Sequence, residues 1–334
     1  MTIRDSIIRL SGRNDLSEGD AAQAMTEIMT GVATPAQIAA FLTALHLKGE
    51  TAAEIAGMAR IMRDHALAVN VRPGAVDTCG TGGDGAGTFN ISTIAAFVAA
   101  GAGIRIAKHG NRAMSSRCGS ADVLEGLGVN LELEPNEVAQ RIDTHHFGFM
   151  FAPRFHPAMR FAGPVRREIG IRTAFNLLGP LTNPARVRRQ VIGTANDTLA
   201  RKLADALSLL NMEAVMVYAG CGNVDELSLE GENIVYEVHG NRPIERYLID
   251  GPALGLTRAA NTALAGGDTL ENVTIARAIL SGQGTPAQHD VVVFNAAAAI
   301  RAADMDQSWQ QAIERARASI ASGAAQHRLQ QAIV

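Results

Sequence analysis

The spacing of apolar residues changes abruptly at Pro73-Gly74, and this change constrains the fold more than any other feature of the sequence. Residues 1 to about 68 show only helical spacing. From residue 75 onward, short apolar runs alternate with helical patterns. Such alternation is typical of an α/β domain with a mostly parallel sheet. The sequence therefore predicts a small all-helical domain at 1–70 and a larger α/β domain at 71–334.

The first domain shows clear signals for where its helices begin and end. Ser17, Thr34 and Thr51 each precede a segment with helical spacing, and each can cap a helix N-terminus. Gly31 and Gly49 end the first two of these segments. We therefore expect a small helical bundle.

The second domain contains five short apolar runs that are typical of buried strands, at 75–79, 103–107, 147–151, 188–195 and 213–220. Helical patterns lie at 90–101, 120–128, 134–143 and 197–210. Residues 233–249 predict a hairpin that turns at Gly240-Asn241, and the chain beyond about 258 is mostly helical. The segment 152–187 fits neither pattern, and we expect part of it to join the helical domain.

Composition excludes several classes of protein. The net charge of the 334 residues is −3, which argues against a bulk nucleic-acid binder. No run approaches the roughly 20 apolar residues of a membrane span. The first twenty residues carry charges throughout, unlike a signal peptide. The three cysteines, Cys79, Cys118 and Cys221, lie far apart, which fits a reducing compartment. We expect a cytoplasmic protein without membrane or nucleic-acid partners.

The sequence GTGGDGAGTFNIST (80–93) is the strongest local signal, because five glycines crowd one loop between a predicted strand and helix. Glycine permits positive φ and close approach, so such a loop can direct several N–H groups at an anion. The N-terminus of the following helix favours the same ligand. Asp84 would repel a bare phosphate, which points to a sugar phosphate with a divalent cation. A plain glycine-rich turn is the alternative interpretation.

Two common nucleotide motifs do not fit this loop. Gly80, Gly82 and Gly85 match the dinucleotide-binding spacing, but the next predicted strand is followed by Lys108-His109 and lacks the ribose-binding acid. No Gly-Lys-Ser/Thr sequence follows, so a Walker A motif is also excluded. An NAD-dependent oxidoreductase is therefore disfavoured.

A second loop follows the second predicted strand and is rich in cations and hydroxyls. Between residues 105 and 120 it carries Arg105, Lys108, Arg112, Arg117 and three serines. We expect a second anion site there, although a solvated surface loop is the alternative. Ser120 is placed to cap the following helix. Two such loops at the ends of adjacent parallel strands suit a ligand with two separated phosphate groups.

Arginines concentrate further along, where eight fall between residues 154 and 189 and only Glu168 opposes them. Arginine suits carboxylates and phosphates. Such a basic stretch also fits a nucleic-acid-binding regulator. However, the segment lacks the interleaved aromatic residues that stack on single strands. It therefore favours a small anionic ligand.

Two adjacent acids, Asp225 and Glu226, follow a predicted strand. Carboxylates at such a position often bind Mg²⁺ together with water and substrate oxygens. The alternative is a pair of ordinary surface acids, which the two phosphate loops make less attractive. His145, His146 and His156 do not have the spacing of zinc ligands.

These segments together resemble the anthranilate phosphoribosyltransferase family, within the nucleoside phosphorylase and phosphoribosyltransferase fold. The resemblance is carried by segments 33–51, 80–93, 108–116, 119–128, 170–185, 225–228 and 274–282. It implies transfer of the phosphoribosyl group from phosphoribosyl pyrophosphate to the amine of anthranilate, in tryptophan biosynthesis. It also implies two Mg²⁺ ions in each active site and a homodimer formed through the helical domain.

The resemblance implies a role for each matching residue. Contacts to phosphoribosyl pyrophosphate are implied for Gly80, Gly83, Asp84, Thr88, Asn90, Ile91, Ser92, Thr93, Lys108, His109, Gly110, Asn111, Arg112, Ala113, Met114, Ser115, Ser116 and Ser120. Contacts to anthranilate are implied for Gly80, His109, Asn111, His156, Arg166 and Gly179, with Arg166 facing the carboxylate. Ser92, Asp225 and Glu226 would hold magnesium. Lys108 and Arg112 would stabilise the charge that develops on the leaving pyrophosphate.

The sequence departs from the family pattern at Arg117, Cys118 and Ala174. The rival enzyme class is a pyrimidine nucleoside phosphorylase, which has a similar fold. Those enzymes carry Asp-Lys in the glycine loop, where this chain has Asp84-Gly85. The sequence therefore favours the phosphoribosyltransferase.

Overall fold

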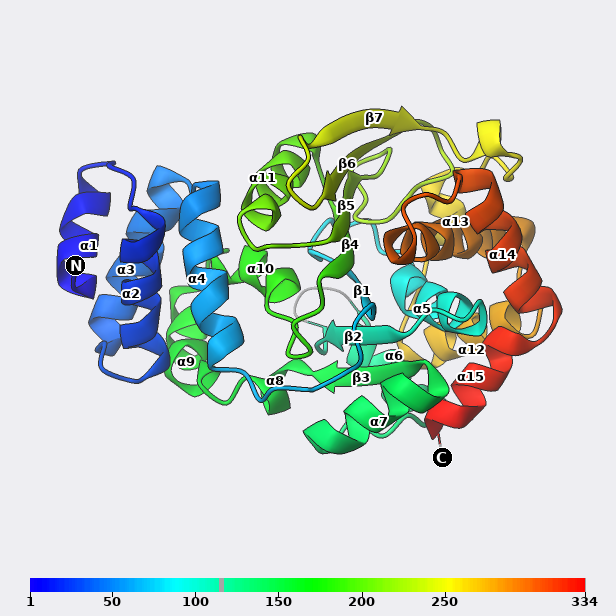
Figure 1. The fold of residues 1–334 in the computed structure, drawn as a ribbon, viewed down its shortest axis with the longest axis horizontal. Helices are drawn as coiled ribbons and strands as arrows, with labels where there is room; N and C mark the ends of the chain where they lie inside the picture. The colour runs from blue at the N-terminus through cyan, green and yellow to red at the C-terminus, as the bar shows by residue number, and fades with distance from the viewer. Residues whose placement is uncertain (114–116, 334) are drawn as a thin grey trace.

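The computed structural model describes residues 1–113 and 117–333. Its first part is a bundle of four helices, seen in blue in Figure 1: α1 (Ile3–Ser11), α2 (Glu18–Met29), α3 (Pro35–Lys48) and α4 (Ala52–Asp64). The side chains of Ser17, Thr34 and Thr51 cap α2, α3 and α4, as predicted. Thr51 and Glu54 form a capping box.

The rest of the chain is built around one seven-stranded sheet. Its strands are β1 (Val76–Gly80), β2 (Ile106–Gly110), β3 (Phe147–Phe151), β4 (Arg189–Thr194), β5 (Ala214–Ala219), β6 (Asn233–His239) and β7 (Glu245–Ile249). Their order is β3-β2-β1-β4-β5-β6-β7. The first five strands in this order are parallel, and the β6–β7 hairpin extends the sheet antiparallel. The predicted α/β fold with a mostly parallel sheet is confirmed.

Helices cover both faces of the sheet, so its central strands are buried on both sides. Val191 and Met216 face one core, while Ile192 and Val215 face the other, as the two-residue period of a strand requires. The first face carries α5 (Ile91–Gly101), α6 (Ser120–Leu127), α12 (Thr269–Leu280), α13 (Pro286–Ala303), α14 (Trp309–Ala321) and α15 (Ala324–Ile333). The second face carries α11 (Asp197–Ser208), and α7 (Pro135–His145) packs near β3. Short turns at Pro252–Leu254 and Asn261–Leu264 precede α12.

The segment between β3 and β4 is helical and returns to the bundle. It forms α8 (Ala152–Phe155), α9 (Met159–Ile169), α10 (Phe175–Leu178) and a 3-10 turn at Gly179–Leu181. Ala162 of α9 and Phe175 of α10 share one apolar core with Phe41 and Met58 of the bundle. Figure 1 accordingly shows α9 and α10, in green, beside the blue helices.

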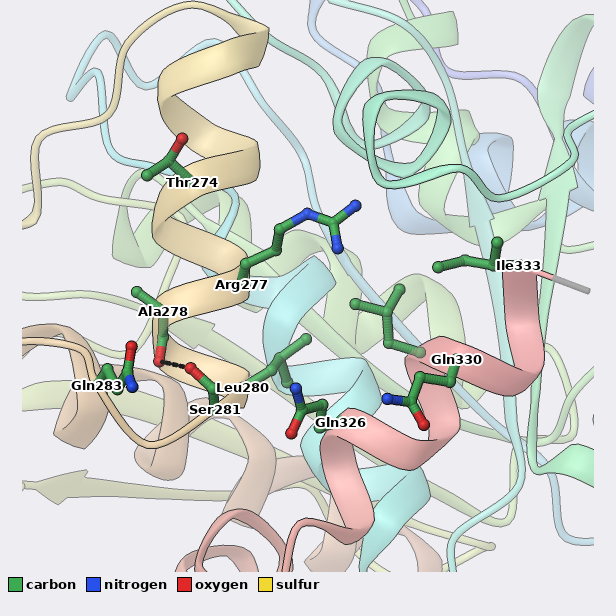
Figure 2. Close-up of a pocket in the computed structure, with 10 residues that line it drawn as sticks. Thr274, Arg277, Ala278, Leu280, Ser281, Gln283, Gln326, Gln330 and Ile333 are labelled. Atoms are coloured by element: carbon green, nitrogen blue, oxygen red, sulfur yellow. Dashed lines mark hydrogen bonds between the residues drawn. The ribbon is translucent and has the colours of Figure 1, made fainter.

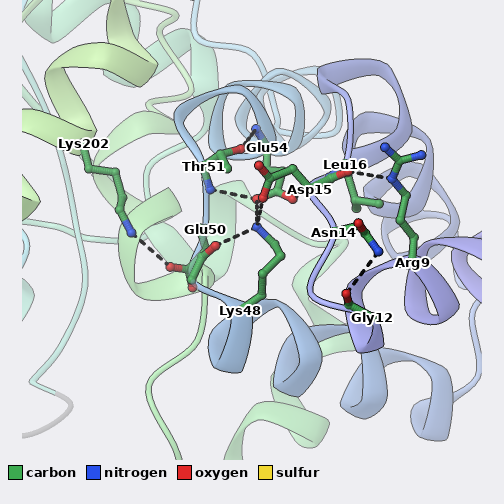
Figure 3. A network of polar contacts seen from close by, with 11 residues as sticks. Arg9, Gly12, Asn14, Asp15, Leu16, Lys48, Glu50, Thr51, Glu54 and Lys202 are labelled. Carbon is green, nitrogen blue, oxygen red and sulfur yellow. Dashed lines mark hydrogen bonds and ion pairs between the residues drawn. The ribbon is translucent and has the colours of Figure 1, made fainter.

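A buried ion pair braces the bundle where it meets the sheet domain (Figure 3). Glu54 is fully buried and accepts hydrogen bonds from the backbone N–H groups of Leu16 and Thr51. The Lys48 ammonium lies 3.0 Å from the same carboxylate. Close by, Lys202 of α11 pairs with Glu50 at 3.6 Å, which joins the two parts of the chain.

The structure corrects two sequence predictions about the second strand and the helix that follows it. The strand spans Ile106–Gly110 instead of 103–107, because Gly103 adopts φ +92° in the turn after α5. Ser120 does not cap the next helix. Gly119 occupies the N-cap position, and the Ser120 hydroxyl donates to the Asn111 carbonyl at 3.2 Å. The other predicted strands are present to within one residue at each end.

Candidate active site

The candidate site lies at the topological switch point of the sheet, beside β1. The chain adds β2 and β3 on one side of β1, and β4 and β5 on the other. In open parallel sheets, ligands bind at the carboxyl ends of the strands beside such a switch point. The glycine loop leaves β1 at this edge, the second loop leaves β2, and the acidic pair follows β5.

The acidic pair reaches across the end of β4 to contact the glycine loop. The Asp225 carboxylate accepts a hydrogen bond from Gly82 N–H at 2.6 Å. The Asp225 N–H donates to Asp84 at 3.2 Å, and Glu226 accepts from Ser92 N–H at 3.0 Å. The predicted magnesium residues are thus brought together with the loop.

The glycines adopt the backbone conformation that the sequence predicted, but several amides of the loop have partners in the protein itself. Gly82, Gly83, Gly85 and Gly87 all have φ between +64° and +74°. However, Asp225 and Glu226 occupy the N–H groups of Gly82 and Ser92, and Asp84 occupies that of Ala86 at 3.1 Å. Carboxylates therefore accept from donors that we expected to face a bound anion.

The surroundings of the acidic pair disfavour its negative charge, and a bound cation would offset that charge. Burial raises the pKa of Asp225 well above its ordinary value, and the nearby Asp84 carboxylate raises it further. Burial likewise raises the pKa of Glu226, with a second contribution from Asp225. One oxygen of Glu226 is buried without a hydrogen-bond partner. These features fit a divalent ion.

A metal ion at the acidic pair would need ligands from outside the protein. In residues 1–113 and 117–333, His, Cys, Asp and Glu side chains nowhere gather in a group of three or more that could hold a metal ion. A cation at the acidic pair therefore requires oxygens from water or substrate to complete its shell.

Lys108 lies beneath the loops and not on their surface. It is a residue of β2, only 2% exposed, and its ammonium donates to the Thr78 carbonyl. Burial lowers its pKa, while Asp77, Cys79 and Glu226 act in the opposite direction. Its positive charge therefore acts on Glu226 of the acidic pair from inside the sheet. Lys108, which we expected in the anion-binding loop, is therefore a buried cation of β2.

Arg112 and the residues beside it are held by helix α6. The Arg112 guanidinium pairs with Glu125 at 2.7 Å and with Asp122 at 3.0 Å. Asp122 also accepts from the N–H groups of Ala113 and Gly119. The exposed Arg112 is thus not a free cation in this structure. Met114, Ser115 and Ser116 lie outside the described residues.

Arg105 does not belong to the second loop as the sequence suggested. It directly precedes β2, at the end of the strand opposite the site. Its guanidinium donates to the Pro73 carbonyl and lies 3.7 Å from Asp143. Arg117 is in the loop, exposed, and 3.4 Å from Glu271. The cationic cluster therefore consists of fewer residues than the spacing indicated.

Three of the residues implied for anthranilate lie together: His109, His156 and Gly179. The rings of His109 and His156 are both buried and 5.0 Å apart. Burial lowers the pKa of His156 to about 4 and also lowers that of His109, whose ring is hydrogen-bonded to the Gly179 backbone. The Nε2 atoms of both rings lack a partner. Two neutral rings with unused nitrogens suit an aromatic ligand.

Arg166 lies on α9, at the junction with the helical bundle. Its guanidinium stacks over the Phe175 ring at 5.0 Å, and burial lowers its pKa. Asn111 is exposed at the end of β2, and Gly80 ends β1. The residues implied for anthranilate therefore come from several separate elements, with Arg166 on the bundle side and the histidine pair beside the sheet.

Of the remaining implied residues, Thr88, Ile91 and Thr93 lie at or just before the start of α5, and Gly110 lies on β2. Ile91 and Thr93 are buried, and the Thr93 hydroxyl has no partner. Thr88 pairs with Ala265 in an isolated bridge, while Gly110 ends β2. A buried Ile91 side chain leaves only its main chain to contact a ligand.

Sequence reasoning missed the role of Arg172. Its guanidinium donates to the carbonyls of Gly83, at 3.2 Å, and Gly82, at 3.4 Å. It therefore holds the glycine loop from the segment that returns to the helical bundle. The eight-arginine stretch was visible in the sequence, but nothing there singled out this member.

A cleft of about 390 Å³ lies away from these loops, between α12 and α15 (Figure 2). It is lined by residues that include Arg277, Gln283, Gln326 and Gln330. None of its lining residues is among those implied for substrate or metal.

Comparison with known proteins defines the class. Residues 4–66 match a model described as the helical bundle domain of a glycosyl transferase family, and residues 72–326 match the α/β domain of that family. An anthranilate phosphoribosyltransferase from Roseiflexus sp. (strain RS-1) is 59% identical over 100% of this chain and 98% of its own length. One from Chloroflexus aggregans is 58% identical over the same shares.

Solved structures similar to this chain belong to the same class of enzyme. The enzyme of the same name from Thermus thermophilus superposes with a TM-score of 0.93 at 43% identity, covering 98% of both chains. The Saccharomyces cerevisiae enzyme, in complex with PRPP and Mg, gives 0.91 at 28% identity over 99% of this chain and 96% of its own. The chain belongs to the anthranilate phosphoribosyltransferase family. This membership supports a phosphoribosyltransferase over a pyrimidine nucleoside phosphorylase.

No helix in the described part of the chain combines the length and apolar character needed to cross a bilayer.

Proposed function

We propose that this chain transfers the phosphoribosyl group of phosphoribosyl pyrophosphate (PRPP) to the amine of anthranilate, with release of pyrophosphate. The observation that carries the proposal is the meeting of Asp225 and Glu226 with the N–H groups of Gly82 and Ser92. A sugar diphosphate with a divalent cation requires such carboxylates and amides side by side.

Ser92, Asp225 and Glu226 are the residues we assign to magnesium, with two ions in each site. The unpartnered Glu226 oxygen and the raised pKa values of both acids support this assignment. Bound Mg²⁺ would supply positive charge to the pyrophosphate oxygens.

The donor would be held by the glycine loop and by the second loop. Binding of its phosphates to the amides of Gly82 and Ser92 requires the two carboxylates to release them. Lys108 stays beneath the site and offsets the charge of the acids from within β2. For Arg112 to stabilise the leaving group, its guanidinium must leave Glu125 and Asp122.

The acceptor would lie between the histidine pair and Arg166. His109, His156 and Gly179 form the aromatic side, Asn111 and Gly80 lie at the strand ends, and Arg166 faces the carboxylate. The aniline nitrogen is neutral near pH 7, so it can attack the anomeric carbon without a strong general base. Positioning of the two substrates then supplies much of the rate.

The test is a fluorescence assay of anthranilate loss in the presence of PRPP, with and without Mg²⁺. Mg²⁺-dependent loss of anthranilate is expected. Phosphate-dependent cleavage of thymidine without anthranilate turnover would favour the nucleoside phosphorylase instead.

Three further assignments accompany this function. The domain boundary lies at residues 70 and 71, with part of 152–187 joined to the helical domain. The chain forms a homodimer through that domain, where Ile8 of α1 and Leu47 of α3 are exposed apolar residues on two helices in contact. The enzyme acts in the cytoplasm. Light scattering of Ile8→Asp and Leu47→Asp variants tests the dimer, which both substitutions should weaken.

A further inference from the structure

Asn272, in the first turn of α12, is a buried amide that the family resemblance did not assign. It is 2% exposed. Its Oδ1 accepts from the N–H of Gly267 at 2.8 Å, and its Nδ2 donates to Oδ1 of Asn90 at 3.0 Å. Asn90 in turn donates from Nδ2 to the Cys118 carbonyl at 3.2 Å. Three distant segments of the chain are therefore joined by two side-chain amides.

The polarity of this chain of hydrogen bonds is determined at both ends by the backbone. The Gly267 N–H can only donate, so it must face an oxygen of Asn272. The Cys118 carbonyl can only accept, so it must face the nitrogen of Asn90. With both ends defined, neither amide can be flipped without placing two donors or two acceptors together. Asn272 and the Cys118 carbonyl thus together define which way the Asn90 amide points.

The same part of the chain also holds the glycine loop by its backbone. Gly266 N–H donates to the Gly87 carbonyl at 2.8 Å, and Phe89 N–H donates to the Leu264 carbonyl at 3.0 Å. Gly266 has no room for a side chain, because a Cβ would collide with the Phe89 main chain. The segment before α12 is consequently the support on which the end of the glycine loop rests.

Asn90 itself does not cap the helix that it precedes. Its side chain points to the second loop instead, and Nδ2 carries two hydrogens, of which the Cys118 carbonyl uses one. The other is available to a ligand oxygen that lies between the two loops.

We propose that Asn272 is a positioning residue for donor binding: it orients the Asn90 amide so that its nitrogen faces the second loop and the donor. The inference rests on the proposed role of Asn90 in binding PRPP. In this proposal Asn272 touches no substrate and acts through Asn90. The two residues lie 182 positions apart in sequence, and the hydrogen bond between their side chains joins them directly.

The test uses two variants of Asn272 in the full-length chain with Mg²⁺ present. Asn272→Asp keeps the acceptor for Gly267 but places a carboxylate oxygen against Asn90 Oδ1, so the Cys118 carbonyl alone is left to orient the Asn90 amide. Asn272→Leu keeps the branched shape of the side chain, although it is larger, buries no charge and loses both bonds. Each should raise KM for PRPP by about three- to tenfold, which corresponds to one hydrogen bond, and leave KM for anthranilate within about twofold of its original value.

Val273→Ala is the matched control, because it removes a neighbouring buried side chain of α12 without touching Asn90. It should lower Tm and leave both KM values unchanged. A double-mutant cycle completes the test. If Asn272 acts through Asn90, Asn272→Leu has no further effect on KM for PRPP in an Asn90→Ala background.

Equal KM for PRPP in the wild-type chain and Asn272→Leu would overturn the inference alone, as would additive effects in the cycle. If the wild-type chain shows no PRPP-dependent turnover, the proposed function fails and this inference fails with it. Should Asn272→Asp not fold, the Leu variant and the cycle still decide the matter.

Discussion

The backbone carbonyl of Asp225 lies directly against Gly193 at the end of β4, where a Cβ atom would collide with it. This contact lets the loop after β5 cross the end of β4 and bring its acids to the glycine loop of β1. Gly193 is therefore a steric requirement of the site, although it carries no functional group.

Replacement of Gly193 by Ala should displace the acidic loop. Overpacking against a backbone atom typically costs about 1–3 kcal/mol of unfolding free energy. We expect a lower Tm and a larger Mg²⁺ requirement in the fluorescence assay. Gly163→Ala is the control, because that glycine lies in α9 with only the end of Arg167 near its Cβ position. An unaltered Mg²⁺ requirement in Gly193→Ala would contradict the assignment.

The acidic pair can be tested without a change of shape. Asp225→Asn with Glu226→Gln removes both negative charges while each side chain keeps an oxygen for the amides of Gly82 and Ser92. The Mg²⁺-dependent rate should collapse, whereas Tm should hold or rise because neutral amides replace two buried acids. Glu232→Gln, an exposed acid shortly after the pair, serves as the control. Full activity in the double variant would refute the metal role.

Arg166 should act on the acceptor alone. Loss of a hydrogen bond to a charged group costs about 1.5–3 kcal/mol, so Arg166→Ala should raise KM for anthranilate by roughly 10- to 150-fold. KM for PRPP should change little. Arg167→Ala, on the same helix but exposed, provides the comparison. If anthranilate KM is the same in both variants, Arg166 does not face the carboxylate.

The buried histidines predict a loss of stability in mild acid. Burial lowers the pKa of His156 from 6.5 to about 4, so between these values the unfolded chain binds a proton that the folded chain does not. Stability is therefore complete above pH 6.5 and falls as the pH drops toward 4, by about 3 kcal/mol for this residue. Denaturant titrations of wild type and His156→Gln across this range measure the difference. Identical pH dependence in the two chains would show that His156 is not buried neutral.

Much of the fold follows from local patterns in the sequence. Ser17, Thr34 and Thr51 cap their helices as predicted, because capping is decided within a few residues. The β3 strand was predicted at its observed bounds, since its apolar run is sharply delimited. The predicted bounds of the second strand were wrong because a lysine is typical of a loop. In the structure Lys108 belongs to β2, and its ammonium donates to the Thr78 carbonyl inside the sheet.

The candidate site, too, was predictable from the sequence only in part. The sequence by itself determined that glycines, cations and acids follow successive strands, because strand order and loop composition are local properties. Only the tertiary structure decided that Asp225 reaches Gly82 across β4, that Arg112 pairs with α6, and that Asn272 orients Asn90. These contacts join residues far apart along the chain, and their formation depends on packing that no local pattern records.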